Sequence, residues 1–259
     1  MPLLENSLMG KVDKVAIAMR RIREFEPAEG YYVAFSGGKD SIVIYDLTKR
    51  SGVKHDVHHH LTTVDPPELV QFLRKHYKEV PLEKPTINMW KLIQARGFPP
   101  TRKQRYCCEV LKERGGENRS ILTGVRWAES RSRTKRRMTE TCLRGKSRIF
   151  VHPIIDWTDQ EVWEYIHVNR LPYCKLYDEG FDRLGCVMCP SQTRKGMERD
   201  AKRWPTYYNM YMKTFAKMLK ERDEVGKTSL RWNSAEELME WWMQGEPMEK
   251  AEGISGLFI

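Results

Sequence analysis

No run of about 18 consecutive apolar residues occurs in this sequence of 259 residues, and this absence excludes a membrane-spanning helix. Residues 1–10 also lack the positively charged segment and following apolar stretch of a secretory signal. Internal repeats and low-complexity linkers are missing as well. We therefore expect a cytoplasmic protein that consists of one domain, or of one domain with a smaller helical appendage.

Cysteine is scarce, with six residues, and a disulfide framework is not expected in a cytoplasmic chain of this length. Four of the six are clustered, as the adjacent pair Cys107 and Cys108 and as the Cys-x-x-Cys of Cys186 and Cys189. This spacing predicts four thiolates that converge on one metal centre. Soft thiolates suit both zinc and an iron–sulfur cluster, and spacing alone does not decide between these two and reduced structural cysteines. We interpret Cys142 as a bystander.

The charge balance favours anionic partners. The formal net charge is +10, which makes nucleic acid and anionic small molecules the candidate partners. The stretch 126–148 is either a solvated basic loop or a surface that binds the phosphates of a nucleotide or of a nucleic-acid backbone. Its basic residues are Arg126, Arg131, Arg133, Lys135, Arg136, Arg137, Arg144, Lys146 and Arg148.

Short apolar runs alternate with helical patterns up to about residue 190. Runs typical of buried strands lie at 31–35, 57–64, 120–125 and 148–154. Helical patterns lie at 11–25, from residue 42 onward, and at 68–76, 90–93 and 162–166, the last after a capping box at 158–161. The alternation predicts an α/β fold with a parallel sheet flanked by helices, and a ligand at the carboxyl ends of the strands.

The strand pattern stops after residue 190. Residues 195–222 are rich in charge, tyrosine and methionine, and 234–243 is typical of a capped helix. We therefore predict a nucleotide-binding domain at 1–190 and a helical C-terminal extension at 191–259. Aromatic residues of the extension fit either a packing face or a surface on which bases stack; they are Trp204, Tyr207, Tyr208 and Tyr211.

A glycine-rich loop, Ser36-Gly37-Gly38-Lys39-Asp40-Ser41, lies between the first predicted strand and a helix. Its glycines allow a tight turn and a close approach of the backbone to a ligand, and loop amides at a helix N-terminus favour an anion. Lys39 supplies a charge for outer phosphates, the serines supply hydroxyl donors, and Asp40 either fixes the loop or helps to hold a metal ion. The spacing differs from that of the Walker loop. A plain glycine turn is the alternative interpretation.

The loop and several later segments resemble the PP-loop of ATP pyrophosphatases and sulfonucleotide reductases. The chain is most similar to phosphoadenosine phosphosulfate reductase-like proteins over residues 30–195, and the resemblance implies a Rossmann-like sheet of the PP-loop type. The segments that carry it are Val33–Ser41, His59–Glu68, Arg105–Lys112, Gly124–Arg126 with Glu129, Ser130 and Arg133, and Pro153–Trp157 with Val162 and Trp163.

The resemblance also implies an ATP-type nucleotide above the first strand, on residues 36–41 and Gly124. It implies that Arg126 and Arg133 lie near phosphate or sulfate, which suits the forked geometry of arginine. The residues implied on the adenosine side are His59, with His60 as its alternative, Thr62 and Asp65.

For the cysteines, the resemblance favours a [4Fe–4S] cluster over zinc, because assimilatory adenylyl-sulfate reductases use a Cys-Cys pair with a Cys-x-x-Cys. Related sulfur-inserting PP-loop enzymes instead draw one ligand from one segment and two from another. Cys174 is a fifth candidate, which could replace Cys108.

Two features depart from the reductases. Those enzymes carry a catalytic cysteine near the C-terminus, whereas this sequence has no cysteine after Cys189, so the attacking thiolate is missing. Their phosphate loop is serine-rich and lacks lysine, whereas Lys39 and Asp40 are typical of the form that handles a triphosphate. We therefore expect cleavage of ATP with Mg²⁺ at the α–β bond and release of pyrophosphate, with Lys39, Asp40, Arg126 and Arg133 as the catalytic residues.

By analogy, the expected role is sulfur transfer to a nucleic acid or a small acceptor, with a sulfur donor or thiol protein as partner. One alternative is a sulfonucleotide reductase that uses a thiol from a partner. The other is a non-catalytic nucleotide-binding module of a nucleoprotein assembly.

Overall fold

The computed structural model describes residues 3–7, 10–142, 147–224 and 232–245. The chain divides into two compact units. Unit 1 comprises Met1–His59, Pro67–Glu83 and Gly115–Leu184, and unit 2 comprises His60–Pro66, Lys84–Arg114 and Gly185–Ile259. Among the described residues, no helix has the length and apolar character needed to cross a bilayer.

These units differ from the predicted domains at 1–190 and 191–259. The predicted boundary marks the point where the strand pattern stops along the chain. Unit 2 combines the C-terminal helices with two earlier segments, and a change of composition along the sequence does not report such long-range packing.

Unit 1 is built on a six-stranded sheet with the order β5-β4-β3-β6-β8-β7. Strand β3 pairs in parallel with β4 and β6, and β6 pairs in parallel with β8, whereas β7 runs antiparallel to β8. The predicted α/β fold with a mostly parallel sheet is therefore confirmed. The strands are β3 (Tyr31–Ala34), β4 (His55–His60), β5 (Leu82–Glu83), β6 (Ser120–Leu122), β7 (Thr139–Thr141) and β8 (Ile149–Val151).

The strand order places a topological switch beside β3. After β3 the chain passes through a helix to β4 on one side, whereas β6 pairs with the other side of β3. Parallel sheets bind ligands outside the carboxyl ends of the strands at such a point. The glycine-rich loop follows β3 and the segment Gly124–Arg126 follows β6, so both lie at this crevice.

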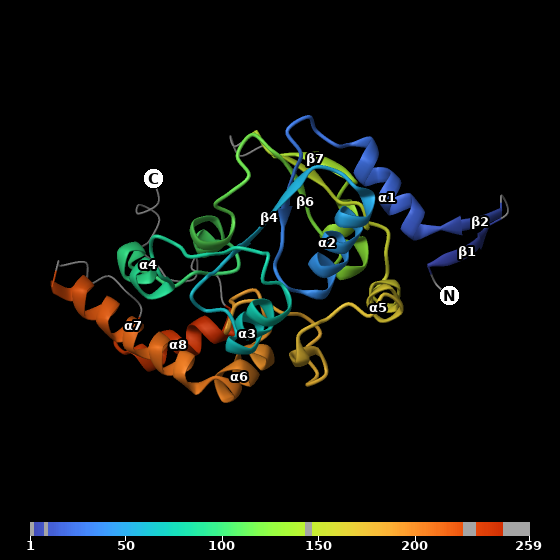
Figure 1. Ribbon diagram of the computed structural model, residues 1–259. Coiled ribbons are helices and arrows are strands. Elements are labelled where there is room, and N and C mark those ends of the chain that lie inside the picture. The colour runs from blue at the N-terminus through green and yellow to red at the C-terminus, as the bar shows by residue number, and fades with distance from the viewer. Residues whose placement is uncertain (1–2, 8–9, 143–146, 225–231, 246–259) are drawn as a thin grey trace. The chain divides into compact units, whose positions relative to one another are not determined.

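The helices of unit 1 are α1 (Lys14–Glu24), α2 (Lys39–Ser51), α3 (Pro67–His76) and α5 (Asp159–Val168). Helix α2 packs against α1 and α5 (Figure 1). The predicted capping box is confirmed, because the Glu161 amide donates to Thr158 Oγ1 at 3.2 Å and the Thr158 amide donates to the Glu161 carboxylate at 2.6 Å.

The predicted N-terminal helix begins later than expected. Strand β2 (Gly10–Asp13) pairs with β1 (Leu4–Ser7) in an antiparallel hairpin, which the apolar pattern did not indicate. The Asp13 carboxylate accepts hydrogen bonds from the amides of Val15 and Ala16. This N-cap fixes the start of α1 at Lys14.

Unit 2 is helical, as predicted for the described residues after 190. Its helices are α4 (Met89–Arg96), a π-helical turn at Cys108–Lys112, α6 (Arg194–Arg203), α7 (Pro205–Glu224) and α8 (Ala235–Gln244). Helix α7 packs against α4, α6 and α8 (Figure 1). Tyr211 is buried between Trp90 and Trp242, with ring centroids 4.9 Å from each, so this aromatic residue belongs to the packing face.

Candidate nucleotide site and cysteine set

The phosphate loop, residues 36–41, is held by its own serines. Ser41 Oγ donates to the Gly38 carbonyl at 2.8 Å and accepts from the Ser36 amide at 3.2 Å and from Ser36 Oγ at 3.1 Å. The Gly38 amide donates to Ser36 Oγ at 3.3 Å. The two serines therefore fix the turn as well as offering hydroxyl groups.

The two glycines of the loop serve different needs. Gly37 has φ +74°, and a Cβ there would lie 2.8 Å from Leu73 Cδ2 and 2.9 Å from Leu69 Cδ1. Gly38 has φ −79° and is the N-cap of α2, and a Cβ there would find its nearest atoms at 3.4 Å. The fold thus requires glycine at Gly37, whereas at Gly38 glycine leaves space beside the helix N-terminus.

Tyr177 lies at this helix N-terminus. Its hydroxyl accepts a hydrogen bond from the Lys39 amide at 2.8 Å. Lys39 itself is buried, and its Nζ donates to the Asp182 carbonyl at 3.0 Å and lies 3.4 Å from Asp159 Oδ1. The hydroxyl oxygen of Tyr177 thus occupies a position at which a helix N-terminus favours an anion.

Arg126 is fully buried and joins three segments. Its Nε donates to Asp40 Oδ1 at 2.7 Å, one terminal nitrogen donates to Asp159 Oδ1 at 2.7 Å, and the other donates to the Trp157 carbonyl at 3.1 Å. Partial burial opposes ionisation of Asp159, but the hydrogen bonds from Arg126 and Lys39 hold its pKa below the usual value. Asp40 is therefore held by Arg126, and its two predicted roles, fixing the loop or helping to hold a metal ion, stay predictions.

A second arginine faces the same place. Glu129 accepts a hydrogen bond from the Arg126 amide at 3.0 Å and forms an ion pair with Arg133. Burial, followed by repulsion from Arg183, lowers the pKa of Arg133 to about 10, although Asp40 acts in the opposite direction. Repulsion between Arg133 and Arg183 shows that positive charge is concentrated here, although Glu129 also pairs with Arg133, and positive charge of this kind attracts phosphate.

Gly124 permits the close approach of the two loops. A Cβ at this position would lie 2.8 Å from Asp40 Cβ and 2.9 Å from the Asp40 carbonyl carbon. Backbone atoms cannot move aside as a flexible side chain can, so only glycine fits here. The segment that carries Arg126 can thus lie directly against the first turn of α2.

The predicted adenosine-side residues fall into different units. His59 belongs to unit 1, where its ring Nδ1 donates to the Phe35 carbonyl at 2.9 Å, next to the phosphate loop. Thr62 and Asp65 belong to unit 2 and are bonded to each other, with Thr62 Oγ1 2.8 Å from Asp65 Oδ1 and the Thr62 amide 2.7 Å from Asp65 Oδ2. His60, the alternative to His59, is also a residue of unit 2 and is buried.

Cys107, Cys108, Cys186 and Cys189 all lie in unit 2; we call them the cysteine set. The hydrogen bond from the Cys107 thiol, joined by one from Arg105 at 3.3 Å, lowers the pKa of Cys108 to about 6. The same contact with Cys108 raises the pKa of the Cys107 thiol, with burial and the charges of Cys186 and Cys189 as further causes. One thiolate is therefore favoured in this pair at neutral pH.

The Cys-x-x-Cys loop is held by Asp200. This buried carboxylate accepts hydrogen bonds from the Met188 amide and from Gln192 Nε2, both at 2.9 Å. Met188 has φ +55°, a conformation that a non-glycine residue adopts only when its surroundings enforce it. The Cys186 thiol donates to Thr62 Oγ1 at 3.4 Å, and burial raises its pKa to about 12.

The fifth candidate ligand is placed elsewhere. Cys174 is a buried residue of unit 1, and burial raises the pKa of its thiol. The four clustered cysteines thus belong to unit 2 and Cys174 to unit 1, and the choice among these five candidate ligands stays a prediction. Among the described residues, no three His, Cys, Asp or Glu side chains are arranged to hold a metal ion.

The basic stretch 126–148 is not one solvated face. Arg126 and Arg148 are buried, and Arg136 pairs with Glu140. The members that are exposed to solvent include Arg131, Lys135, Arg136 and Arg137, while Arg144 and Lys146 lie outside the described residues. Part of this charge thus belongs to the nucleotide site, and binding of nucleic acid by the stretch stays a prediction.

Known proteins resemble this chain in sequence and in fold. The family model described as the phosphoadenosine phosphosulfate reductase domain matches residues 30–192. The chain belongs to this family. The resemblance predicted from the phosphate loop and its companion segments is confirmed, and it places the chain in the PP-loop superfamily of adenine nucleotide α-hydrolases.

Among relatives, the adenosine 5'-phosphosulfate reductase of Oceanobacillus iheyensis is 30% identical over 185 residues, which cover 66% of this chain and 75% of that protein. An uncharacterised protein of Methanocaldococcus jannaschii is 29% identical over 209 residues, which cover 77% of this chain and 51% of that protein. The chain thus spans about half the length of this archaeal relative. The crystal structure of phosphoadenylyl-sulfate reductase from Candida auris, a phosphate complex, has the same fold, with a TM-score of 0.51 and 19% identity over 66% of this chain and 89% of that one.

Sequence reasoning missed two residues of the candidate nucleotide site. Tyr177 contacts the Lys39 amide and Arg183 adds positive charge beside Arg133. Neither belongs to a local motif, because each reaches the site through the fold. Asp156 of the family signature has a structural role, since it forms a two-pronged ion pair with Arg21 of α1 at 2.8 and 2.9 Å.

Proposed function

We propose that the chain binds ATP on the phosphate loop and cleaves it at the α–β bond. An oxygen atom of the acceptor, or of water when no acceptor is present, attacks the α-phosphorus, which gives an adenylated acceptor or AMP and releases pyrophosphate. The observation that supports this most is the gathering of Lys39, Arg126, Arg133 and Arg183 around the N-terminus of α2. The triphosphate group of ATP carries more negative charge than the phosphosulfate group of an adenylyl sulfate, and a lysine within the loop can neutralise part of that additional charge.

Each side chain has a role in this reaction. Charge builds up on the departing pyrophosphate, and Lys39 together with the amides at the start of α2 would stabilise it. For this, Lys39 Nζ exchanges the Asp182 carbonyl for phosphate oxygens. Arg126 is buried and orients Asp40, while Arg133 contributes positive charge from the neighbouring turn. Mg²⁺ enters with ATP and neutralises part of the phosphate charge.

We further propose that the cysteine set holds a [4Fe–4S] cluster. The chemistry of the donor set supports this, because soft thiolates are the ligands that such clusters take and because Arg105 and the Cys107 thiol favour the thiolate of Cys108. In the structure, however, the described cysteine side chains are not arranged as a metal site. When bound, the cluster would position or pass sulfur. The protein's own part is to hold the Cys-x-x-Cys loop in shape through Asp200. Zinc is the alternative ion for the same ligands.

The acceptor in this proposal is a nucleic acid or a small molecule, and the sulfur comes from a donor or thiol protein. A specific observation favours a second candidate: several relatives of similar sequence are adenosine 5'-phosphosulfate reductases. In that case the chain would bind an adenylyl sulfate on the same loop and use a thiol supplied by a partner.

Pyrophosphate release separates the candidates. Purified protein is incubated with ATP and Mg²⁺, and pyrophosphate is measured for the wild type, for Lys39→Ala and for Lys49→Ala. The last variant removes the same charge from the far end of the same helix, where Lys49 is exposed. We expect release by the wild type and Lys49→Ala and none by Lys39→Ala.

Equal release by all three proteins, or none by the wild type, would contradict the ATP proposal. Sulfite release from an adenylyl sulfate with an added thiol would instead establish the reductase. For the cluster, anaerobic purification followed by iron, zinc and sulfide analysis is decisive, with Cys108→Ser expected to lose iron and Cys142→Ser expected to retain it.

A further inference from the structure

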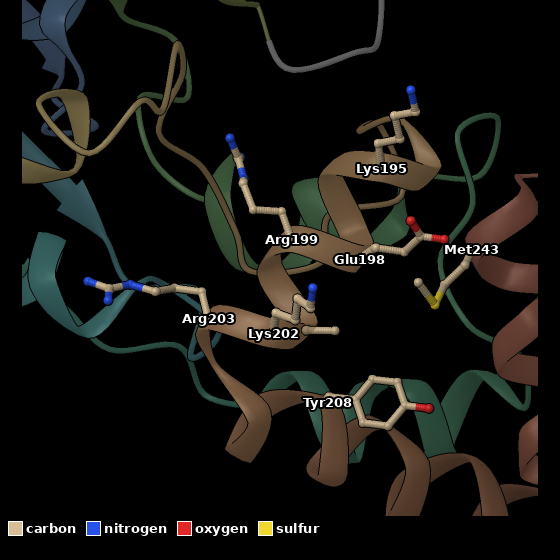
Figure 2. A pocket seen from close by; sticks show the side chains of 8 residues that line it. Lys195, Glu198, Arg199, Lys202, Arg203, Tyr208 and Met243 are labelled. Carbon is tan, nitrogen blue, oxygen red and sulfur yellow. The ribbon is translucent and has the colours of Figure 1, made fainter.

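Unit 2 contains an open groove lined mainly by α6, with side chains from α7 and α8. Its volume is about 980 Å³. Figure 2 shows the basic side chains that project from α6, with the ring of Tyr208 below them and Met243 beside them. The groove lies outside the nucleotide site of unit 1 and contains none of the cysteines.

Four cations follow one another along α6. Lys195, Arg199, Lys202 and Arg203 line the groove, at positions i, i+4, i+7 and i+8, which form a continuous surface on a helix. With a rise of about 1.5 Å per residue, they cover roughly 12 Å. A nucleic-acid strand carries one negative charge per nucleotide, so several of these cations can contact its phosphates at once.

The acidic residue in the lining does not cancel this charge. Glu198 lines the groove, but its carboxylate accepts a hydrogen bond from Arg194 at 2.9 Å. Arg194 in turn contacts Glu240 at 2.6 Å. The groove therefore presents four cationic side chains, of which Arg199 lies 3.6 Å from the Asp200 carboxylate, and one carboxylate, Glu198, that already has a cationic neighbour.

The floor of the groove is not charged. Tyr208 is half-buried and its ring faces the space beside α6, close to Met243 of α8 (Figure 2). An aromatic ring next to a line of cations suits a strand whose phosphates contact the cations while a base stacks on the ring. In a duplex the faces of the bases are stacked on one another, so Tyr208 can stack only on a base of an unpaired strand.

We propose that this groove binds single-stranded nucleic acid. Lys195, Arg199, Lys202 and Arg203 contact the phosphates and Tyr208 stacks on one base. In the context of the proposed function, this surface would hold the acceptor. Binding of the strand is measured without ATP. A failure to bind the strand would therefore not contradict the proposed ATP reaction, and a failure of the ATP reaction would not contradict binding of the strand.

The test uses fluorescence anisotropy with a labelled single strand of about 12 nucleotides, within the range that small binding modules occupy. Wild type, Lys195→Ala/Lys202→Ala and Lys217→Ala/Lys220→Ala are titrated at 50 and 200 mM salt. The last variant removes the same charge from exposed positions of α7. Thermal unfolding of each variant confirms that it is folded.

Removal of two phosphate contacts reduces the slope of log affinity against log salt by about 1.4 for a single strand, so the ratio of Kd at 200 mM to Kd at 50 mM falls by about sevenfold. We expect this change for Lys195→Ala/Lys202→Ala and not for Lys217→Ala/Lys220→Ala. Tyr208→Ala should weaken binding by about 5- to 150-fold, whereas Tyr208→Phe should bind like the wild type because it keeps the stacking surface.

Three further probes identify the ligand. Preference for RNA over DNA of the same sequence, or the reverse, names the sugar and supports the proposal in either case. Equal binding of the matching duplex, or displacement of the strand by an equal charge of polyglutamate, would overturn it in favour of a duplex or an acidic protein. Equal salt slopes for the two double variants would overturn it outright.

Discussion

Replacement of each loop glycine by alanine separates folding from binding at the phosphate loop. At Gly37 the added methyl group must adopt φ +74° and would lie within 2.9 Å of Leu69 and Leu73. The left-handed conformation costs about 1–2 kcal/mol, and crowding in a packed core costs about 1–3 kcal/mol more. We expect Gly37→Ala to lower the free energy of unfolding by about 2–4 kcal/mol, after a small gain from the stiffer unfolded chain.

At Gly38 the same substitution should leave the fold intact. The backbone has φ −79° and ψ 159°, which alanine adopts readily, and the nearest atoms to the new Cβ stand at 3.4 Å. The unfolded chain loses freedom, so stability should be unchanged or higher by up to about 1 kcal/mol. The methyl group would, however, lie between Ser36 Oγ and the Tyr177 hydroxyl, where a phosphate must approach.

The loss of one charge-assisted hydrogen bond costs about 1.5–3 kcal/mol, so Gly38→Ala should weaken ATP binding by about 10- to 150-fold. Urea unfolding gives the stability and calorimetric titration with ATP and Mg²⁺ gives the affinity. Gly185→Ala, where a Cβ meets nothing within 4 Å, is the control for the change in chain entropy. If Gly38→Ala binds ATP as the wild type does, the backbone of this loop does not contact the phosphates, and the argument for the site fails.

The remaining predictions concern three other side chains. Tyr177→Phe removes the hydroxyl that competes for the Lys39 amide, so ATP should bind about 2- to 10-fold more tightly by calorimetric titration; weaker binding would show that the hydroxyl contacts the nucleotide instead. Burial, partly opposed by Glu140, lowers the pKa of His152 to about 4, so between pH 6.5 and 4 the unfolded chain binds a proton that the folded chain does not. The free energy of unfolding should therefore fall by about 2 kcal/mol from pH 7 to pH 5, and urea titrations should find that His152→Gln lacks this part of the slope. Asp200→Asn weakens the hydrogen bond from the Met188 amide, so mass spectrometry should detect faster alkylation of Cys186 and Cys189. The free energy of unfolding should fall by about 1–3 kcal/mol. Unchanged alkylation would mean that the loop keeps its shape without this carboxylate.

Local patterns were enough to predict the elements that bear the site. The phosphate loop is one contiguous segment whose glycines, serines and lysine encode a turn between strand and helix. The capping box of α5 and the parallel core strands were equally readable, because their signals lie within a few residues. The antiparallel strand Thr139–Thr141 and the hairpin at β1 and β2 were missed, since their short, polar sequences carry no apolar period.

The sequence by itself therefore determined the fold class, the family and the position of the phosphate loop, all of which depend on residues close together along the chain. The tertiary structure alone decided which side chains meet there. Tyr177 reaches the Lys39 amide from 138 positions away, and Cys186 reaches Thr62 from 124 positions away. It also made Asp200 a support of the Cys-x-x-Cys loop. Contacts between residues so far apart in sequence depend on the order of the strands and on the packing of the helices. Both are determined by the burial of apolar side chains over the whole chain, and no single segment encodes them.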